Sequence, residues 1–325
     1  MTDPIREQTL YARQLLFDRH QTPVGEELLY REQPVPNRAP PAFDPCRATS
    51  QVLVNAFTRN PQAAFSAAHP AFVNFSADML AQGLPFRPEQ LTIEVLESVQ
   101  ASPRVIEQIQ RLKADGHRIA LDDYCRLDAE HPLLPEADIV KLEYPSIGTA
   151  QLAPLVARLK QRRPRLTVLA EKIETQDELE HCLEAGCDVL QGYYLHEPEP
   201  VITTVAPIAP SAVAALRSQL RRGPRRHHKL ARLLQHSSGL AESVHRLARH
   251  WRPDLASQPL GTEQAAQLVS SAQLSELTEL LAATQAPLSA RRPSRLGRPL
   301  LRWAGSSPTE HGGTAGAEPL QANTG

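Results

Sequence analysis

Short apolar runs alternate with longer amphipathic stretches through the first two thirds of the chain. Runs rich in Val, Ile and Leu predict buried strands, and apolar positions spaced three and four apart predict helices. One helix begins after Ser102 with Pro103 at its first position and ends at Gly116, and another has a capping box of Thr175 and Glu178. The predicted strands are residues 10–17, 24–31, 71–76, 91–97, 118–124, 138–143, 166–171 and 189–192.

The first two of these runs read as a hairpin, and strand then alternates with helix from about residue 71 to residue 191. Alternation of this kind predicts a parallel sheet with helices outside it, of which the closed form is a β/α barrel. We therefore expect an α/β fold, a TIM-like barrel, followed by a small all-α domain.

Polar residues recur where the predicted strands end. Asp122 and Asp123 follow one apolar run directly, and two adjacent carboxylates repel each other unless a cation such as Mg²⁺ or Mn²⁺ lies between them. On its own such a pair is more often a solvated turn. In a barrel, however, the carboxyl ends of all strands face one mouth. Polar residues at matching strand positions therefore favour one shared site, and they are Glu27, Asn74, Glu94, Asp122, Asp123, Lys141, Glu171 and Gln191.

Composition narrows the class of protein. The chain has 325 residues and a formal net charge of -1, so about two domains are expected and nothing global indicates nucleic acid. Its four cysteines show neither metal-ligand spacing nor a disulfide framework. No secretory leader and no run able to span a bilayer is evident, so we expect a cytoplasmic protein that does not enter the membrane.

The domain organisation expected from these patterns has five parts. They are an N-terminal arm at 1–8, a barrel at 9–200, a Pro-rich linker at 201–212, a helical domain at 213–303 and a disordered tail at 304–325. The helical part is basic between residues 217 and 252, but a solvated charged face is preferred to nucleic-acid binding because no aromatic residue is interleaved before Trp251. Its histidines, among them His250, lack accompanying carboxylates and are expected at solvated positions.

The ordered motifs resemble those of EAL domains, barrel phosphodiesterases that linearise cyclic di-GMP. The resemblance covers residues 9 to 200 and rests on Glu27-Leu28-Leu29 with Arg31, Asn74, Glu94 with Glu97, Asp122-Asp123, Lys141, Ala170-Glu171 with Glu174, and Gln191-Gly192. The Glu-Leu-Leu form and the Ala-Glu-Lys-Ile-Glu run at 170–174 resemble a subgroup in which a helical HDOD domain follows the barrel.

The resemblance implies a role for each of these residues. Lys141 and Glu171 would position and deprotonate the attacking water. Arg31 and Gln191 would serve substrate binding, with Gln191 also in the network around the metal, while Glu97 and Glu174 would support the site. The implied ligands of one Mg²⁺ or Mn²⁺ are Glu27, Asn74, Glu94 and Asp122, and Asp122 with Asp123 would hold a second.

The chain also departs from the family. Active members carry a glycine-rich loop after the Asp pair, whereas residues 124–130 here read Tyr-Cys-Arg-Leu-Asp-Ala-Glu without a glycine, and Leu96 replaces a threonine. A loop without glycine resists positive φ and should follow another path. Occupancy of the second metal position and turnover are therefore open.

Two functions remain at this point. The first is hydrolysis of cyclic di-GMP to linear pGpG, attenuated by the altered loop. The second is an inactive EAL-type sensor of cyclic di-GMP or a protein-interaction adaptor. A protein partner for the helical half and a homodimer are left open.

Overall fold

The computed structural model describes residues 6–33, 43–60, 62–63, 65–66, 68–124, 131–221, 227–255 and 258–285. The altered loop at 125–130 and the expected tail at 304–325 lie outside the described residues. All the described residues belong to one compact unit. No helix in the described ranges is long and apolar enough to cross a membrane.

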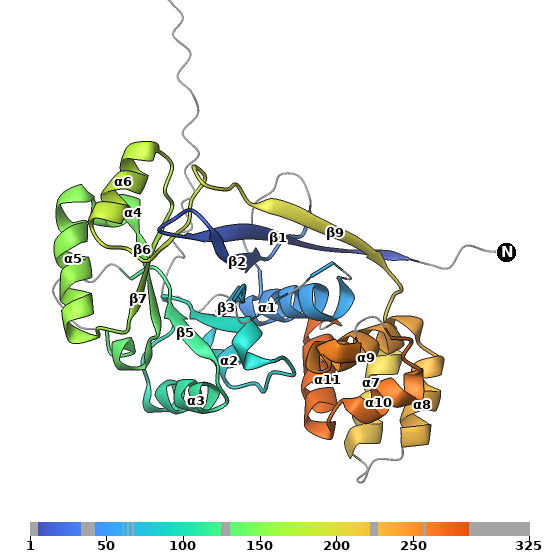
Figure 1. Ribbon diagram of the computed structural model, residues 1–325. Coiled ribbons are helices and arrows are strands. Elements are labelled where there is room, and N and C mark those ends of the chain that lie inside the picture. Colours follow the sequence, from blue (N-terminus) through green and yellow to red (C-terminus); the bar gives the residue numbers. More distant parts are fainter. Residues whose placement is uncertain are drawn as a thin grey trace, which may run out of the picture. The chain divides into compact units, whose positions relative to one another are not determined.

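The predicted barrel is confirmed (Figure 1). Its strands follow the order β2-β3-β4-β5-β6-β7-β8-β1, and β1 closes the ring by pairing antiparallel with both β8 and β2. Neighbouring strands from β2 to β8 are parallel. The strands are β1 (Glu7–Asp18), β2 (Pro23–Leu29), β3 (Ala71–Phe75), β4 (Leu91–Val95), β5 (Arg118–Leu121), β6 (Ile139–Glu143), β7 (Thr167–Glu171) and β8 (Val189–Leu190).

Side-chain alternation divides the barrel interior into an apolar layer and a polar layer. Leu16, Phe72, Ala120, Ile139 and Leu169 form a buried cluster separate from the main core. Side chains two residues apart on a strand point to the same side of the sheet. On each parallel strand, the residue two positions after a member of this cluster therefore also points into the barrel, nearer to the carboxyl end of the strand. The pairs are Phe72 with Asn74, Ala120 with Asp122, Ile139 with Lys141, and Leu169 with Glu171. The apolar layer thus forms a floor for the polar one.

Helices cover the outside of the barrel, and their caps follow the sequence signals. The Ser102 side chain accepts a hydrogen bond from the Val105 backbone at 3.3 Å, and the capping box of Thr175 and Glu178 is present. Gly116 takes φ 102, which closes the first of these helices. The elements are α1 (Pro45–Leu53), η1 (Val54–Arg59), α2 (Ala77–Leu80), η2 (Pro88–Gln90), α3 (Pro103–Ala114), η3 (Leu134–Glu136), α4 (Tyr144–Ile147), α5 (Thr149–Arg162) and α6 (Gln176–Glu184).

In the described part of the chain, further helices follow the barrel and pack against it. They are α7 (Pro210–Arg221), α8 (His227–Gln235), α9 (Ser238–Trp251), α10 (Thr262–Leu268) and α11 (Ser271–Gln285), with the short η4 (Pro253–Leu255). Helix α11 lies against α1, and α9 lies against η1 (Figure 1). The Trp251 indole donates a hydrogen bond to the Pro85 carbonyl at 2.7 Å. One continuous apolar core therefore joins the barrel helices and the C-terminal helices.

Three expectations from the sequence need correction. Residues 201–205, expected as linker, belong to strand β9 (Glu199–Val205), which pairs antiparallel with β1. The expected arm at 1–8 already joins this pairing at Glu7, because the long β1 extends beyond the barrel and offers its edge to β9. His250 is only partly exposed, because its ring lies edge-on to Phe57 and Phe86 and accepts a hydrogen bond from the Arg87 backbone at 2.8 Å.

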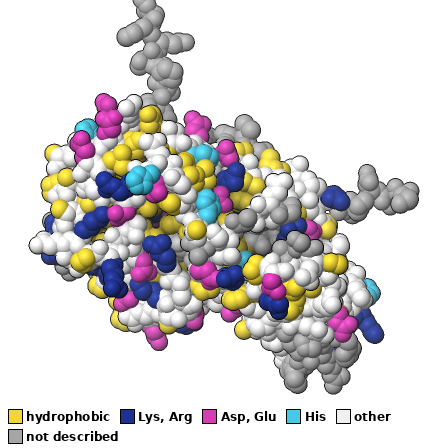
Figure 2. Space-filling model, in the orientation of Figure 1, with side chains coloured by type: hydrophobic (Ala, Val, Ile, Leu, Met, Phe, Trp, Pro, Cys, Tyr) yellow, Lys and Arg dark blue, Asp and Glu magenta, His cyan; other side chains and the backbone are white. Residues whose placement is uncertain are grey.

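Charged side chains of both signs are interspersed over the face drawn in Figure 2. This distribution agrees with the near-zero net charge of the chain.

Candidate active site

Lys141 lies at the centre of a ring of carboxylates above the apolar floor. Its side chain is 2% exposed. Four strands bring four acids to it, and each comes from the polar end of its own strand. The distances from Lys141 Nζ are 3.5 Å to Glu27, 3.0 Å to Glu94, 3.0 Å to Asp122 and 3.1 Å to Glu171. Four negative charges around one ammonium leave the ionised cluster strongly negative.

Several oxygen atoms beside this ring have no hydrogen-bond donor among the described residues. They are Asn74 Oδ1, both carboxylate oxygens of Glu94, and Gln191 Oε1, and all are buried. Glu94 Oε1 lies within ion-pair distance of Lys141 without hydrogen-bond geometry. A buried oxygen without a partner is costly, and a hard divalent cation takes carboxylate and amide oxygens as its ligands. The donor set therefore fits Mg²⁺, Mn²⁺ or Ca²⁺.

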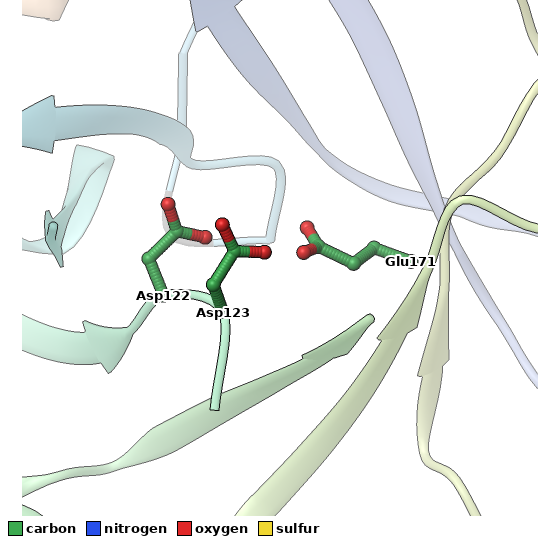
Figure 3. Close-up of side chains that lie close together, drawn as sticks. All are labelled: Asp122, Asp123 and Glu171. Atoms are coloured by element: carbon green, nitrogen blue, oxygen red, sulfur yellow. The ribbon is translucent and has the colours of Figure 1, made fainter. Parts of the chain in front are cut away.

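A second group of acids lies at the outer edge of the same mouth. Carboxylate oxygens of Asp122, Asp123 and Glu171 all lie within 4.8 Å of one another. Figure 3 shows the two aspartates on the segment after β5 and Glu171 reaching toward them from the end of β7. Asp122 and Glu171 belong to both groups, so two cation positions at this mouth would lie next to each other.

Electrostatics in the cluster are dominated by burial. Burial, followed by the charge of Glu27, raises the pKa of Glu94 well above its ordinary value, and Lys141 only partly opposes this. Burial likewise raises the pKa of Glu171 well above the usual range. Burial alone would lower the pKa of Lys141, but the surrounding carboxylates, Asp122 first, outweigh it and raise that pKa. The lysine therefore remains a fixed positive charge at neutral pH.

Three amides complete the inner site, and one of them, Gln14, was not predicted from the sequence. Gln191 donates to Glu27 Oε2 at 2.7 Å and to Gln14 Oε1 at 3.0 Å. Asn74 donates to Glu27 Oε1 at 3.2 Å, so both oxygens of this carboxylate are oriented. Gln14 lies on β1, two residues before Leu16 of the apolar floor. The same period-two argument would have identified Gln14 as an interior residue.

The remaining predicted residues lie at the rim. Arg31 is 6% exposed, donates to the Tyr30 carbonyl and is within electrostatic reach of Glu27. Glu97 is exposed, and burial followed by the charges of Asp123 and Asp122 raises its pKa. The Glu174 side chain is exposed, and its backbone amide donates to Glu178 Oε2 at 2.6 Å. The structure thus brings Arg31 to the mouth but gives Glu174 no contact with the acid cluster among the described residues.

Lys172 and Glu143 are further residues of the outer edge that the sequence did not single out. Lys172 Nζ lies 2.7 Å from Glu143 Oε1 and 3.6 Å from Asp123 Oδ1. Asp123 and Lys172 have φ of 44° and 61°, in the left-handed region that non-glycine residues seldom adopt. In the sequence, Lys172 is noticeable only as part of the Ala-Glu-Lys-Ile-Glu run at 170–174. Nothing in that run indicates which way its side chain points.

Comparison with known proteins finds a family that part of the barrel resembles. Residues 56–198 match the EAL domain family. The chain is 33% identical over 196 residues to the cyclic di-GMP phosphodiesterase CdgJ of Vibrio cholerae, which covers 59% of this chain and 44% of that protein. It is 31% identical over 194 residues to the uncharacterized protein YuxH of Bacillus subtilis, covering 58% of this chain and 46% of that protein. The chain thus spans less than half the length of either relative.

Among solved structures, the cyclic di-GMP complex of the PaMucR phosphodiesterase aligns with a TM-score of 0.48 at 22% identity, over 59% of this chain and 92% of that chain. The family match begins in η1 and ends after β8, so it contains strands β3 to β8 and the acid cluster from Asn74 to Gln191. Residues 56–198 of this chain are thus similar to the EAL domain family over the strands that carry most of the acid cluster.

Proposed function

We propose that this chain is a metal-dependent phosphodiesterase that hydrolyses cyclic di-GMP to linear pGpG. The observation that carries the proposal is the group of buried oxygens without hydrogen-bond donors beside a ring of four carboxylates that share one lysine. The EAL match and the phosphodiesterase activity named for CdgJ supply the substrate class.

In this proposal the residues divide into two metal positions. Glu27, Asn74, Glu94 and Asp122 would hold one Mg²⁺ or Mn²⁺, and Asp122 with Asp123 would hold a second. When bound, these cations would supply positive charge that stabilises the developing charge on the phosphoryl group.

The other roles fall to side chains of the chain itself. Glu171 would accept the proton of the attacking water, and burial raises its pKa, which makes the carboxylate a stronger base. Lys141 would add fixed positive charge next to it. Arg31 would hold a phosphate of the substrate with two guanidinium nitrogens. Gln191 would orient Glu27 and help to bind the substrate. Glu97 would support the segment after Asp123.

The second candidate function is binding of cyclic di-GMP without hydrolysis. The observation that favours it is Lys172, whose ammonium group lies against Asp123 at the outer metal position. We also propose that the chain divides into a barrel at 9–200 and a degenerate HDOD-like helical domain at 213–303. The described helices from α7 to α11 support the helical character of this second part.

The test is hydrolysis of cyclic di-GMP by the purified chain in Mg²⁺ or Mn²⁺, with binding followed by calorimetry in Ca²⁺. Glu171→Ala should abolish turnover and retain binding. Glu180→Ala, an exposed glutamate on α6, is the matched control and should behave as the unaltered chain. Turnover that survives in Glu171→Ala would remove Glu171 from its assigned role. Binding without turnover in the unaltered chain would favour the sensor.

A further inference from the structure

Lys172 follows the proposed general base directly at the end of β7. Because its φ is 61°, the chain turns sharply after Glu171, and the next side chain reaches the outer edge of the mouth. A side chain in this backbone conformation is disfavoured, and glycine is the residue that adopts it freely. A lysine at this position therefore has a local conformational cost that its contacts must offset.

Those contacts hold the ammonium group against two acids. Its Nζ atom lies 2.7 Å from Glu143 Oε1 and 3.6 Å from Asp123 Oδ1, and the side chain is only 30% exposed. The other oxygen of Glu143 accepts a hydrogen bond from the Ser146 hydroxyl at 2.7 Å, which orients this carboxylate toward the lysine. The lysine is thus part of an ordered ion-pair group.

This ion-pair group overlaps the outer metal position. Asp123 belongs both to the ion pair with Lys172 and to the acids whose oxygens lie within 4.8 Å of one another. An ammonium and a divalent cation that share one carboxylate repel each other, and in a partly buried site this repulsion is only weakly screened.

We propose that Lys172 is a built-in counter-ion of the outer acids that weakens binding of the second divalent cation. This inference rests on the proposed function for its assignment of the two metal positions. It predicts that the charge of Lys172 affects the outer position and not the inner one, since Lys172 pairs with Asp123 and Glu143 and not with Glu27 or Glu94. The second divalent cation should therefore bind only at a higher concentration than it would without this charge.

The test measures Mn²⁺ binding to the metal-free full-length chain, by calorimetry and by the electron paramagnetic resonance signal of free Mn²⁺. Lys172→Met removes the charge and keeps the length of the side chain, and it should tighten the weaker Mn²⁺ site by about tenfold. Lys172→Arg keeps the charge and should retain the weak site.

Lys160→Met is the matched control for loss of a lysine. Lys160 is 33% exposed and pairs with Asp188 at 2.6 Å, before β8 at the opposite end of the barrel. Its replacement should leave both Mn²⁺ affinities unchanged. Circular dichroism and thermal unfolding in EDTA establish that each variant is folded.

The outcomes separate this inference from the proposed function. If the unaltered chain binds Mn²⁺ and Lys172→Met binds it with the same stoichiometry and affinities, the counter-ion role is wrong while the metal site stands. If neither protein binds Mn²⁺, both proposals fail. A second Mn²⁺ that binds more tightly in Lys172→Met alone supports the inference, whether or not any variant hydrolyses cyclic di-GMP.

Discussion

The Nζ atom of Lys141 lies 3.0 Å from Oε1 of Glu94, whose side chain has no exposed surface. Neither carboxylate oxygen of Glu94 accepts a hydrogen bond from a described residue, so the ammonium group is its main compensation. Three more acids compete for the same ammonium. The folded state without a metal ion therefore depends on this lysine for the electrostatic balance of the barrel mouth.

Lys141→Met should destabilise the metal-free protein strongly. Removal of one partner from a buried ion cluster costs about 3–5 kcal/mol, because the acids that remain are uncompensated or must become protonated. The measurement is urea unfolding in EDTA. Lys113→Met is the control, because Lys113 is 27% exposed and pairs with Asp138 at 2.8 Å, and its loss should cost at most about 1 kcal/mol. Equal stabilities of the two variants would contradict the central role of Lys141.

Glu27→Ala should reduce turnover of cyclic di-GMP below detection and weaken Mn²⁺ binding. Glu27 faces Lys141 and accepts hydrogen bonds from Asn74 and Gln191, so its loss removes one proposed ligand and releases both the ligand Asn74 and the Gln191 amide. Glu26→Gln is a control on the same strand, because alternation turns Glu26 to the other side, where it lies 3.7 Å from Arg13. Normal turnover in Glu27→Ala would refute the site assignment.

The polar layer of the site could be predicted from the sequence because it depends on local pattern alone. Each strand places its last interior residue at the same mouth, and strand ends are visible where an apolar run stops. Asp122 after residues 118–121 and Lys141 within 139–143 illustrate this. Period-two alternation then fixes which residues share a face.

The other features of the fold and of the site depend on contacts between segments that are distant in the sequence, and no local pattern encodes such contacts. The pairing of β9 with β1 joins Glu199 to Arg13, and His250 enters the space beside Phe86. Lys172 lies 3.6 Å from Asp123, and both residues have positive φ, which the sequence does not signal at a lysine or an aspartate.

Gly192→Ala should destabilise the barrel and impair the site together. A Cβ atom at this position would overlap the backbone oxygen and nitrogen of Ile173, and backbone atoms cannot move aside as a flexible side chain can. The clash adjoins Gln191, so displacement would also disturb its hydrogen bond to Glu27. Thermal unfolding should show a large decrease in Tm. In Gly261→Ala the new Cβ meets only the Gln264 side chain at 3.4 Å, so its Tm should change little.

Stability should fall on acidification through His250. Burial lowers the pKa of this ring from 6.5 to about 4, with the nearby Arg87 charge acting in the same direction. A depressed folded-state pKa stabilises the fold above the unfolded value of 6.5, and this contribution is lost as the pH falls toward 4. One pKa unit corresponds to about 1.4 kcal/mol, so the loss between pH 7 and pH 4 is roughly 3 kcal/mol.

His250→Gln tests this directly, because a glutamine oxygen can still accept the hydrogen bond from the Arg87 backbone but does not titrate. The free energy of unfolding, measured in urea, should fall more steeply between pH 7 and pH 4 in the unaltered chain than in the variant. His236→Gln replaces an exposed histidine of the same helical region and should keep the steep pH dependence. If the free energy of unfolding falls equally with pH in His250→Gln and in the unaltered chain, protonation of His250 is not what weakens the packing of α9 on the barrel.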